Sequence, residues 1–257
     1  MAELGWLGLP FEEEDGGFGG NQIDVLVVME QFGRGLVLEP YLASIVMGGG
    51  ALKRGGTDAL KSEILPQVIE GTLQLAFAYA EEQSRFDLDD VMTSARKEGE
   101  NFVLNGQKSM VQNAETADKI VVSARTSSGQ VSPQGITLFL IDADAEGLSR
   151  DNFPTVDGLR ASEITLENVS VGPDRILGEV DQGFSILQSV ANDAMLALSA
   201  EAVGAMEVLY KDTVDYTQQR EQFDHPLSEF QVLQHRMVDM FMEYEQCKSL
   251  LYRATME

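Results

Sequence analysis

The sequence contains very few of the residues on which disulfide and metal chemistry depend. Its 257 residues include one cysteine, Cys247, and two histidines, His225 and His235. One cysteine allows no internal disulfide, and neither histidine has cysteine or carboxylate neighbours in a ligand pattern. We therefore expect no metal site, and a chain that works in a reducing cytoplasm.

Basic residues and long apolar runs are also scarce. Lys and Arg together number 18 against 42 Asp and Glu, which gives a formal net charge of −24 and a pI near 4.3. Such a negative field repels phosphate backbones, so we expect no nucleic acid partner. No apolar run reaches the length that spans a bilayer, and the acidic N-terminus is unlike a signal peptide, so we expect no membrane partner.

The familiar catalytic and nucleotide-binding motifs are absent from the sequence. There is no Walker loop, no paired CxxC, no HExxH and no GxSxG. The glycine-rich stretch Gly16–Gly20 follows no predicted strand, so we predict a flexible loop and not a dinucleotide-binding turn. Short motifs of this kind therefore define no activity here.

The spacing of apolar residues divides the chain into three segments, 1–73, 74–183 and 184–257. The outer two have helical spacing, while the middle one has short runs rich in Val, Ile, Thr and Phe, with period two and turn signals between them. We predict an α+β multidomain fold with a helical N-terminal part, a central antiparallel β-barrel or sandwich, and a C-terminal helix bundle. Residues 2–9 look like the last turns of a helix already under way, so we expect the fold to be incomplete at both ends.

Capping residues and helix breakers indicate where helices of the first segment begin and end. Asn21 and Thr57 are predicted N-caps because their side chains can accept a hydrogen bond from the first helical turn. Gly33 and Gly35 are predicted to stop the helix that begins at Asn21, and Pro66 is predicted to break the next one.

The third segment predicts two long helices that pack closely. The first, which extends to about Gln222, is rich in small residues that let helices approach each other. The second follows the turn at Pro226 and has the four-three spacing of a bundle seam at Leu233, Met237, Met240, Tyr244, Cys247 and Leu251. Cys247 lies on this seam, so we expect a core thiol and not a nucleophile. Both helices together predict at least a dimer.

Several stretches resemble the acyl-CoA dehydrogenase family, in the family's order and spacing. They are ELGWLGLPFEEEDGGFGG, GENFVLNGQKSMVQNAETADKIVVSART, GITLFLID, GLRASEITLENVSVGPDRILGE and REQFDHPLSEFQVLQHRMVDM. The resemblance covers essentially the whole chain. AEEQSRFDLDDV, FPTVDGLRASE and LSAEAVGAMEVL are most similar to the small subunit of pimeloyl-CoA dehydrogenase.

This resemblance implies an FAD-dependent α,β-dehydrogenation of an acyl-CoA thioester, in which the electrons pass to an electron-transferring flavoprotein. It also implies a homo-oligomer, or a hetero-oligomer with a related large subunit. The alternative is a non-catalytic structural subunit that lends FAD contacts to a catalytic partner.

The resemblance places the adenine side of an FAD site at the turn between the last two helices. It implies that Arg220 reaches across a subunit interface to the pyrophosphate of another subunit's FAD, where a guanidinium fork suits paired oxygens. It implies that Gln222 hydrogen-bonds the same region, that Phe223 packs near the adenine, and that Phe230 and Gln231 complete this side. Without the resemblance, Arg220 would be interpreted as a surface arginine and Phe223 as a core residue.

The flavin-ring side departs from the family pattern. Where the family has Leu-Thr-Glu-Pro, this chain has Tyr79-Ala80-Glu81-Glu82, so the threonine hydroxyl is missing. The resemblance implies backbone contacts to the ring from Phe77, Tyr79, Ala80 and Glu81. A second family motif, Trp-Ile-Thr or Trp-Ile-Ser, is replaced by Met110-Val111-Gln112, so Met110 stands for the ring-covering aromatic and Gln112 for the hydroxyl. The alternative is that these are ordinary strand residues.

The substrate positions depart further. Phe86 stands where the family has a serine near the thioester, and Asn192 and Met195 stand where it has an aspartate and an arginine for CoA and substrate. Ala194 occupies the position of the catalytic glutamate that some members carry on this helix. The more usual catalytic glutamate falls beyond Glu257, so we expect the base to lie there or on a partner, and no residue is assigned as the base.

Overall fold

A computed structural model describes residues 1–256, which form two compact units. The first contains residues 1–20 and 38–194, and the second contains residues 21–37 and 195–257. This grouping joins residues 21–37 to the C-terminal helices, whereas the sequence pattern divides the chain into three consecutive segments. Within the described residues, no helix is both long enough and apolar enough to cross a bilayer.

The helical part of the first unit differs from its sequence pattern at several glycines. It contains the short helices η1 (Ala2–Leu4), η2 (Trp6–Gly8) and η3 (Glu13–Asp15), then the π-helix η4 (Leu42–Gly49), α2 (Gly50–Gly55) and α3 (Asp58–Glu70). The predicted continuous helix over residues 2–9 is wrong, because Gly5 adopts a left-handed φ of 75° between two 3-10 turns. Gly48 and Gly49 lie within η4 because they pack closely against Leu75 and Phe11.

Helix α3 confirms one prediction and corrects another. Thr57 caps it, since its hydroxyl accepts a hydrogen bond from the backbone nitrogen of Leu60 at 3.2 Å. The predicted break at Pro66 is wrong, because the helix continues through it to Glu70. Apolar burial on one helix face, which includes Ile64, outweighs the single backbone hydrogen bond that proline removes.

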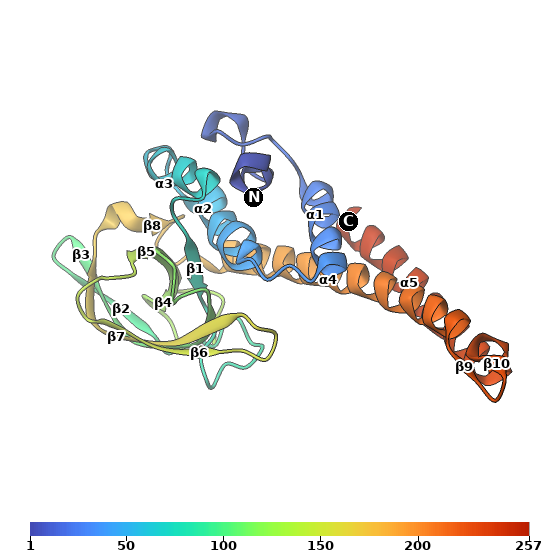
Figure 1. Cartoon of the computed structure of the whole chain (residues 1–257). Coiled ribbons are helices and arrows are strands. Elements are labelled where there is room, and N and C mark those ends of the chain that lie inside the picture. Colours follow the sequence, from blue (N-terminus) through green and yellow to red (C-terminus); the bar gives the residue numbers. More distant parts are fainter. Residues whose placement is uncertain (257) are drawn as a thin grey trace. The chain divides into compact units, whose positions relative to one another are not determined.

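The middle part of the first unit is one mixed sheet. Its strands are β1 (Leu75–Ala78), β2 (Ser94–Glu98), β3 (Asn101–Gln112), β4 (Lys119–Arg125), β5 (Ile136–Asp142), β6 (Leu148–Pro154), β7 (Arg160–Val171) and β8 (Ile176–Leu177). They are arranged in the order β6-β7-β3-β2-β4-β5-β8, with β1 beside β4 (Figure 1). The predicted β-domain is confirmed, but it is not purely antiparallel, because β1 and β2 each pair with β4 in parallel.

The sheet curves around a core in which alternate strand residues face inward. Phe102 of β3 and Phe139 of β5 lie with their ring centroids 5.3 Å apart in this core. Leu104 of β3 and Ile164 of β7 face the same way and are buried. The period-two pattern of the sequence corresponds to burial of one face along much of β3 and β7, whereas β4 and β5 are buried on both faces.

The second unit consists of helices. They are α1 (Gln22–Gly35), the part of α4 (Phe184–Gln219) from Met195 onward, η6 (Leu227–Glu229) and α5 (Gln231–Met256), with the short strands β9 (Glu221–Gln222) and β10 (His225–Pro226) between α4 and η6. The predicted seam of α5 is confirmed, because its six residues are all buried or half-buried while most of their neighbours are exposed. Cys247 is half-buried on this seam.

The predicted cap and the predicted end of α1 are both confirmed. Asn21 accepts a hydrogen bond from the backbone nitrogen of Ile23 at 2.8 Å, and Asp24 completes a capping box. The helix ends at Gly35, so that Gly33 lies in its last turn. Gly33 also serves as a contact with α4, because a Cβ built on it would lie 1.8 Å from the carbonyl oxygen of Glu201.

Gly204 makes the reciprocal contact from α4, since a Cβ there would lie 2.0 Å from the carbonyl oxygen of Glu30. Gly204→Ala should therefore force the two helices apart and lower the free energy of unfolding by about 2–3 kcal/mol. Gly129→Ala is the matched control, because nothing lies within 4 Å of a Cβ at Gly129. Thermal and urea unfolding of both variants would test this, and an unchanged stability of Gly204→Ala would contradict the close contact.

Candidate cofactor site

The chain reverses direction between α4 and α5 through a two-residue turn. Phe223 and Asp224 have φ values of 56° and 64°, which is the requirement for a type I′ turn between β9 and β10. The backbone nitrogen of Leu227 donates to the carbonyl oxygen of Arg220 at 2.8 Å and closes the turn. A positive φ is rare for a bulky side chain, so the turn is strained at Phe223.

This turn presents the predicted adenine-side residues to solvent. Phe223 is 85% exposed and packs edge-to-face with Phe230, with ring centroids 6.3 Å apart. Arg220 is exposed, and among residues 1–256 its guanidinium has no hydrogen-bond or ion-pair partner. Gln222 is exposed and donates to the carbonyl oxygen of Glu221 at 2.8 Å, while Gln231, the first residue of α5, is also exposed.

The predicted flavin-ring residues of the first motif lie where β1 ends. Phe77 is buried in β1, and its ring lies 5.7 Å from that of Tyr79 between centroids. Tyr79 and Ala80 are half-buried, and burial raises the pKa of the Tyr79 hydroxyl. The carbonyl oxygen of Ala80 accepts a hydrogen bond from the backbone nitrogen of Ser109 at 2.9 Å, which brings the two predicted flavin-ring motifs together.

The side chain of Glu81 is buried in an ion pair with Lys108. The Lys108 Nζ lies 2.7 Å from Glu81 Oε1, and it also donates to Ser123 Oγ at 3.0 Å and to the carbonyl oxygen of Tyr79 at 3.4 Å. The Glu81 carboxylate further accepts hydrogen bonds from the backbone nitrogens of Met92 and Thr93, at 2.7 and 3.0 Å. The backbone of Glu81 is also engaged, since its nitrogen donates to Ser84 Oγ at 3.1 Å and its carbonyl oxygen accepts from that hydroxyl at 2.9 Å.

Met110 lies on an irregular stretch of β3. The register between β3 and β7 shifts between Lys108 and Val111, and Met110 has a φ of 54° with 55% of its surface exposed. Glu163 of β7 holds this bulge, because its carboxylate accepts hydrogen bonds from Ser109 Oγ at 2.6 Å and from the Met110 backbone nitrogen at 3.2 Å. Gln112 is exposed at the end of β3.

Sequence reasoning missed Lys108, Ser109 and Glu163. A signal for Lys108 was available, since the alternation of β3 places it on the same face as Phe102 and Leu104. A lysine on the buried face of a strand requires a buried partner. No signal in the sequence identifies that partner, because Glu81 is 27 residues away and follows a different strand.

The predicted substrate residues lie on two elements. Phe86 is 97% exposed in the loop between β1 and β2, and Asn192 and Met195 are exposed three residues apart on α4. Ala194 is buried. Asp193 is no substitute for a catalytic glutamate, since it forms an ion pair with Arg54 of α2. Burial raises the pKa of Asp193, and Arg54 acts against this.

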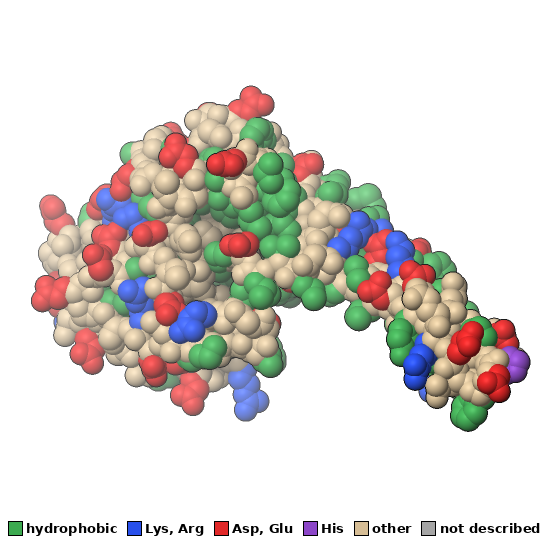
Figure 2. All heavy atoms as spheres, viewed as in Figure 1, with side chains coloured by type: hydrophobic (Ala, Val, Ile, Leu, Met, Phe, Trp, Pro, Cys, Tyr) green, Lys and Arg blue, Asp and Glu red, His purple; other side chains and the backbone are tan. Residues whose placement is uncertain are grey.

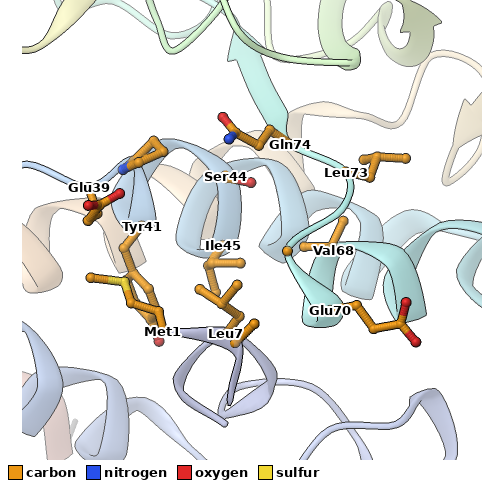
Figure 3. Close-up of a pocket in the computed structure, with 13 residues that line it drawn as sticks. Met1, Leu7, Glu39, Tyr41, Ser44, Ile45, Val68, Glu70, Leu73 and Gln74 are labelled. Carbon is orange, nitrogen blue, oxygen red and sulfur yellow. The ribbon is translucent and has the colours of Figure 1, made fainter. Parts of the chain in front are cut away.

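A cavity of about 270 Å³ lies elsewhere in the first unit, between η4, α3 and the start of the chain (Figure 3). Tyr41, which directly precedes η4, lines it together with Ile45 of η4 and Val68 of α3. None of the predicted cofactor or substrate residues lines this cavity.

Within residues 1–256, no three His, Cys, Asp or Glu side chains are arranged to hold a metal ion. Acidic side chains are scattered over the face of the molecule in Figure 2, with few basic ones among them.

Comparisons with known proteins identify the family. The models for the acyl-CoA dehydrogenase N-terminal, middle and C-terminal domains match residues 1–72, 76–169 and 181–257. A 3-(aryl)acrylate reductase of Clostridium sporogenes is 33% identical over 99% of this chain and 68% of its own length. The CarC subunit of the caffeyl-CoA reductase-Etf complex of Acetobacterium woodii is 30% identical over the same shares.

Solved structures agree with these relatives. Butyryl-CoA dehydrogenase of Megasphaera elsdenii superimposes with a TM-score of 0.91 at 28% identity, over 99% of this chain and 68% of that one. The FAD complex of PigA superimposes with a TM-score of 0.93 at 27% identity, over the same shares. The chain belongs to the acyl-CoA dehydrogenase family of oxidoreductases, whose cofactor is FAD.

The Glu81 ion pair predicts a pH dependence of stability. Burial alone would raise the pKa of Glu81, but the Lys108 charge and the hydrogen bonds to the carboxylate lower it to about 2. Since this value lies below that of the unfolded chain, the stabilisation is present above about pH 4.5 and is lost as the pH falls towards 2. The loss for this one group is on the order of 3 kcal/mol. Burial lowers the pKa of Lys108 to about 8, so the lysine does not titrate in this window.

Urea unfolding between pH 5 and pH 2 should therefore show a smaller loss of stability in Glu81→Gln/Lys108→Met than in the unmodified chain. Glu82→Gln removes an exposed carboxylate beside the pair and should behave like the unmodified chain. Equal acid sensitivity of the double variant and the unmodified chain would contradict the lowered pKa.

Proposed function

We propose that this chain is the small subunit of a hetero-oligomeric acyl-CoA dehydrogenase of the pimeloyl-CoA dehydrogenase kind. It binds FAD, acts with a related large subunit on an acyl-CoA thioester, and passes electrons to an electron-transferring flavoprotein. Its setting is the cytoplasm, in keeping with the unpaired thiol of Cys247. An Etf complex is part of the name of the CarC relative, which supports the electron-transfer partner.

Backbone strain at the predicted cofactor positions carries this proposal. Among the described residues, only three apolar side chains have a positive φ: Leu36, Met110 and Phe223. Met110 and Phe223 belong to the two motifs that the resemblance assigns to the flavin ring and to the adenine. Strain of this kind persists where the surrounding structure enforces it, and it concentrates at ligand sites. Both side chains are also largely exposed, as residues awaiting a ligand would be.

The chemistry of the donors suits FAD. The guanidinium of Arg220 and the amide of Gln222 would hold the pyrophosphate of a neighbouring subunit's FAD, and Phe223 with Phe230 would pack against its adenine. The backbone of residues 79–81 and the side chains of Met110 and Gln112 would lie along the flavin ring. When bound, the flavin would supply the hydride acceptor of the dehydrogenation.

The catalytic base is the part that this chain lacks at the helical position. Ala194 carries no proton acceptor, and Asp193 is occupied by Arg54. Proton removal by a positioned carboxylate contributes on the order of a hundred- to ten-thousand-fold in rate. A base beyond Glu257 or from a partner subunit would complete the reaction.

The second candidate function is a structural subunit that binds no substrate and only lends Arg220 to the FAD of its partner. The replacements at Ala80, Met110 and Ala194 favour it, because each removes a side chain that the family uses in the reaction. The two candidates differ in whether FAD binds against the Met110 bulge of this chain.

The isolated 257-residue chain is expected to show no acyl-CoA dehydrogenase activity, because Ala194 leaves the helical position without a base. Dye-linked assays with straight-chain and dicarboxylic acyl-CoA thioesters would measure this, alone and after co-expression with a related large subunit. Co-expression should restore turnover. Substrate-dependent turnover by the isolated chain would show that another of its own residues acts as the base.

Arg220→Ala in the co-expressed assembly should lower FAD retention at least about ten-fold, since the pyrophosphate loses a charged, forked donor. Arg220→Lys keeps the charge but not the fork, and it should be intermediate. Arg236→Ala removes an exposed arginine from α5 and is the matched control. Flavin absorbance after desalting measures retention, and full occupancy in Arg220→Ala would rule out the proposed role.

A further inference from the structure

The buried ion pair of Lys108 is an unusual way to fill a core. Lys108 is 0% exposed in an otherwise apolar strand face, and Glu81 is 5% exposed. An apolar pair of similar volume would usually stabilise a fold as well or better, because a buried ion pair must offset the desolvation of two charges. The pair therefore calls for an explanation beyond stability.

Directional bonds are what this pair provides and an apolar pair cannot. Through Lys108, strand β3 is tied to the carbonyl oxygen of Tyr79 and to Ser123 of β4. Through Glu81, the segment after β1 is tied to the backbone of Met92 and Thr93, just before β2. Four stretches that are remote in sequence thus meet at one charge pair.

The same contacts lie directly beside the Met110 bulge. Ser109 follows Lys108, and its backbone nitrogen donates to the carbonyl oxygen of Ala80. On the neighbouring strand β7, Glu163 holds the hydroxyl of Ser109 and the backbone nitrogen of Met110. The segment 79–81 and the bulge are therefore linked to each other by the Lys108 side chain and by the backbone of Ser109.

We propose that Lys108 and Glu81 are positioning residues, which hold the segment 79–81 against the Met110 bulge so that both meet the flavin ring in one fixed arrangement. The link to flavin rests on the proposed function. The fixing of the two segments is a property of the chain itself, and it can be measured without flavin.

Hydrogen–deuterium exchange of the flavin-free chain tests the proposal. Glu81→Gln/Lys108→Met removes both buried charges and should keep the melting temperature within about 4 °C of the unmodified chain. Amides in residues 79–84 and 107–113 should nevertheless exchange at least about ten-fold faster, because the directional bonds are gone. Lys119→Met/Asp142→Asn removes a more exposed ion pair between β4 and β5, and it should leave both segments unchanged.

A second variant covers a folding failure of the first. Glu81→Gln/Lys108→Gln removes both charges but keeps one donor for the carbonyl oxygen of Tyr79, so exchange in residues 79–84 should lie between that of the unmodified chain and that of Glu81→Gln/Lys108→Met. If a variant folds and its amides in residues 79–84 and 107–113 exchange at the rate of the unmodified chain, the proposal is overturned, and the pair would only occupy space in the core.

The visible absorbance spectrum of bound flavin gives a second measurement on the same variants. In assemblies reconstituted with FAD, the visible spectrum of the bound flavin should shift in Glu81→Gln/Lys108→Met and not in Lys119→Met/Asp142→Asn. A double variant with faster exchange but an unshifted flavin spectrum would overturn the positioning of the ring. An unmodified assembly that binds no FAD would instead contradict the proposed function, while the exchange result would still decide whether the pair fixes the segments.

Discussion

The contact between Lys108 and Glu81 is the constraint that ties the segment after β1 to strand β3, and the candidate flavin-ring side depends on it. A buried charge pair is tolerated only when its donors and acceptors are satisfied. Here the backbone nitrogens of Met92 and Thr93, just before β2, donate to Glu81, and Ser123 of β4 accepts from Lys108. β1 is short and pairs only with β4, in parallel. After Ala78 the chain no longer pairs with β4. The ion pair, together with the hydrogen bond from the Ser109 backbone nitrogen to the Ala80 carbonyl oxygen, links residues 79–81 to β3.

Exposure and strain recur together in both parts of the candidate site. Met110 on its bulge and Phe223 in its turn have left-handed backbone, and both are largely exposed. Each is supported from behind, by Glu163 in the first case and by the hydrogen bond between Leu227 and Arg220 in the second. Local stability is thus lower than it could be at the two points where we propose that the cofactor binds.

The sequence predicts those features of this fold that local patterns encode. The caps at Asn21 and Thr57 follow from side-chain chemistry within one helical turn, and the α5 seam follows from residue spacing. The break predicted at Pro66 failed because tertiary packing decides it: the burial of its neighbours carries α3 through the proline. Gly33 lies in the last turn of α1 as predicted, but its contact with α4 depends on tertiary packing that local patterns do not encode.

The candidate site divides in the same way. The Arg220 turn could be predicted because its motif is contiguous and its residues face solvent, although their contact with FAD remains a prediction. Lys108 and Glu163 could not be assigned, because their roles arise from pairing between distant strands. The replacements at Ala80, Met110 and Ala194 are visible in the sequence itself.

Anaerobic titration of the flavin-loaded assembly with an acyl-CoA thioester tests the central claim most directly. If the chain provides part of a working dehydrogenase, the flavin absorbance should bleach as substrate is added, and Glu81→Gln/Lys108→Met should bleach more slowly than the unmodified assembly. A flavin-loaded assembly that no straight-chain or dicarboxylic acyl-CoA can bleach would contradict the account, and would leave this chain a structural member of its family.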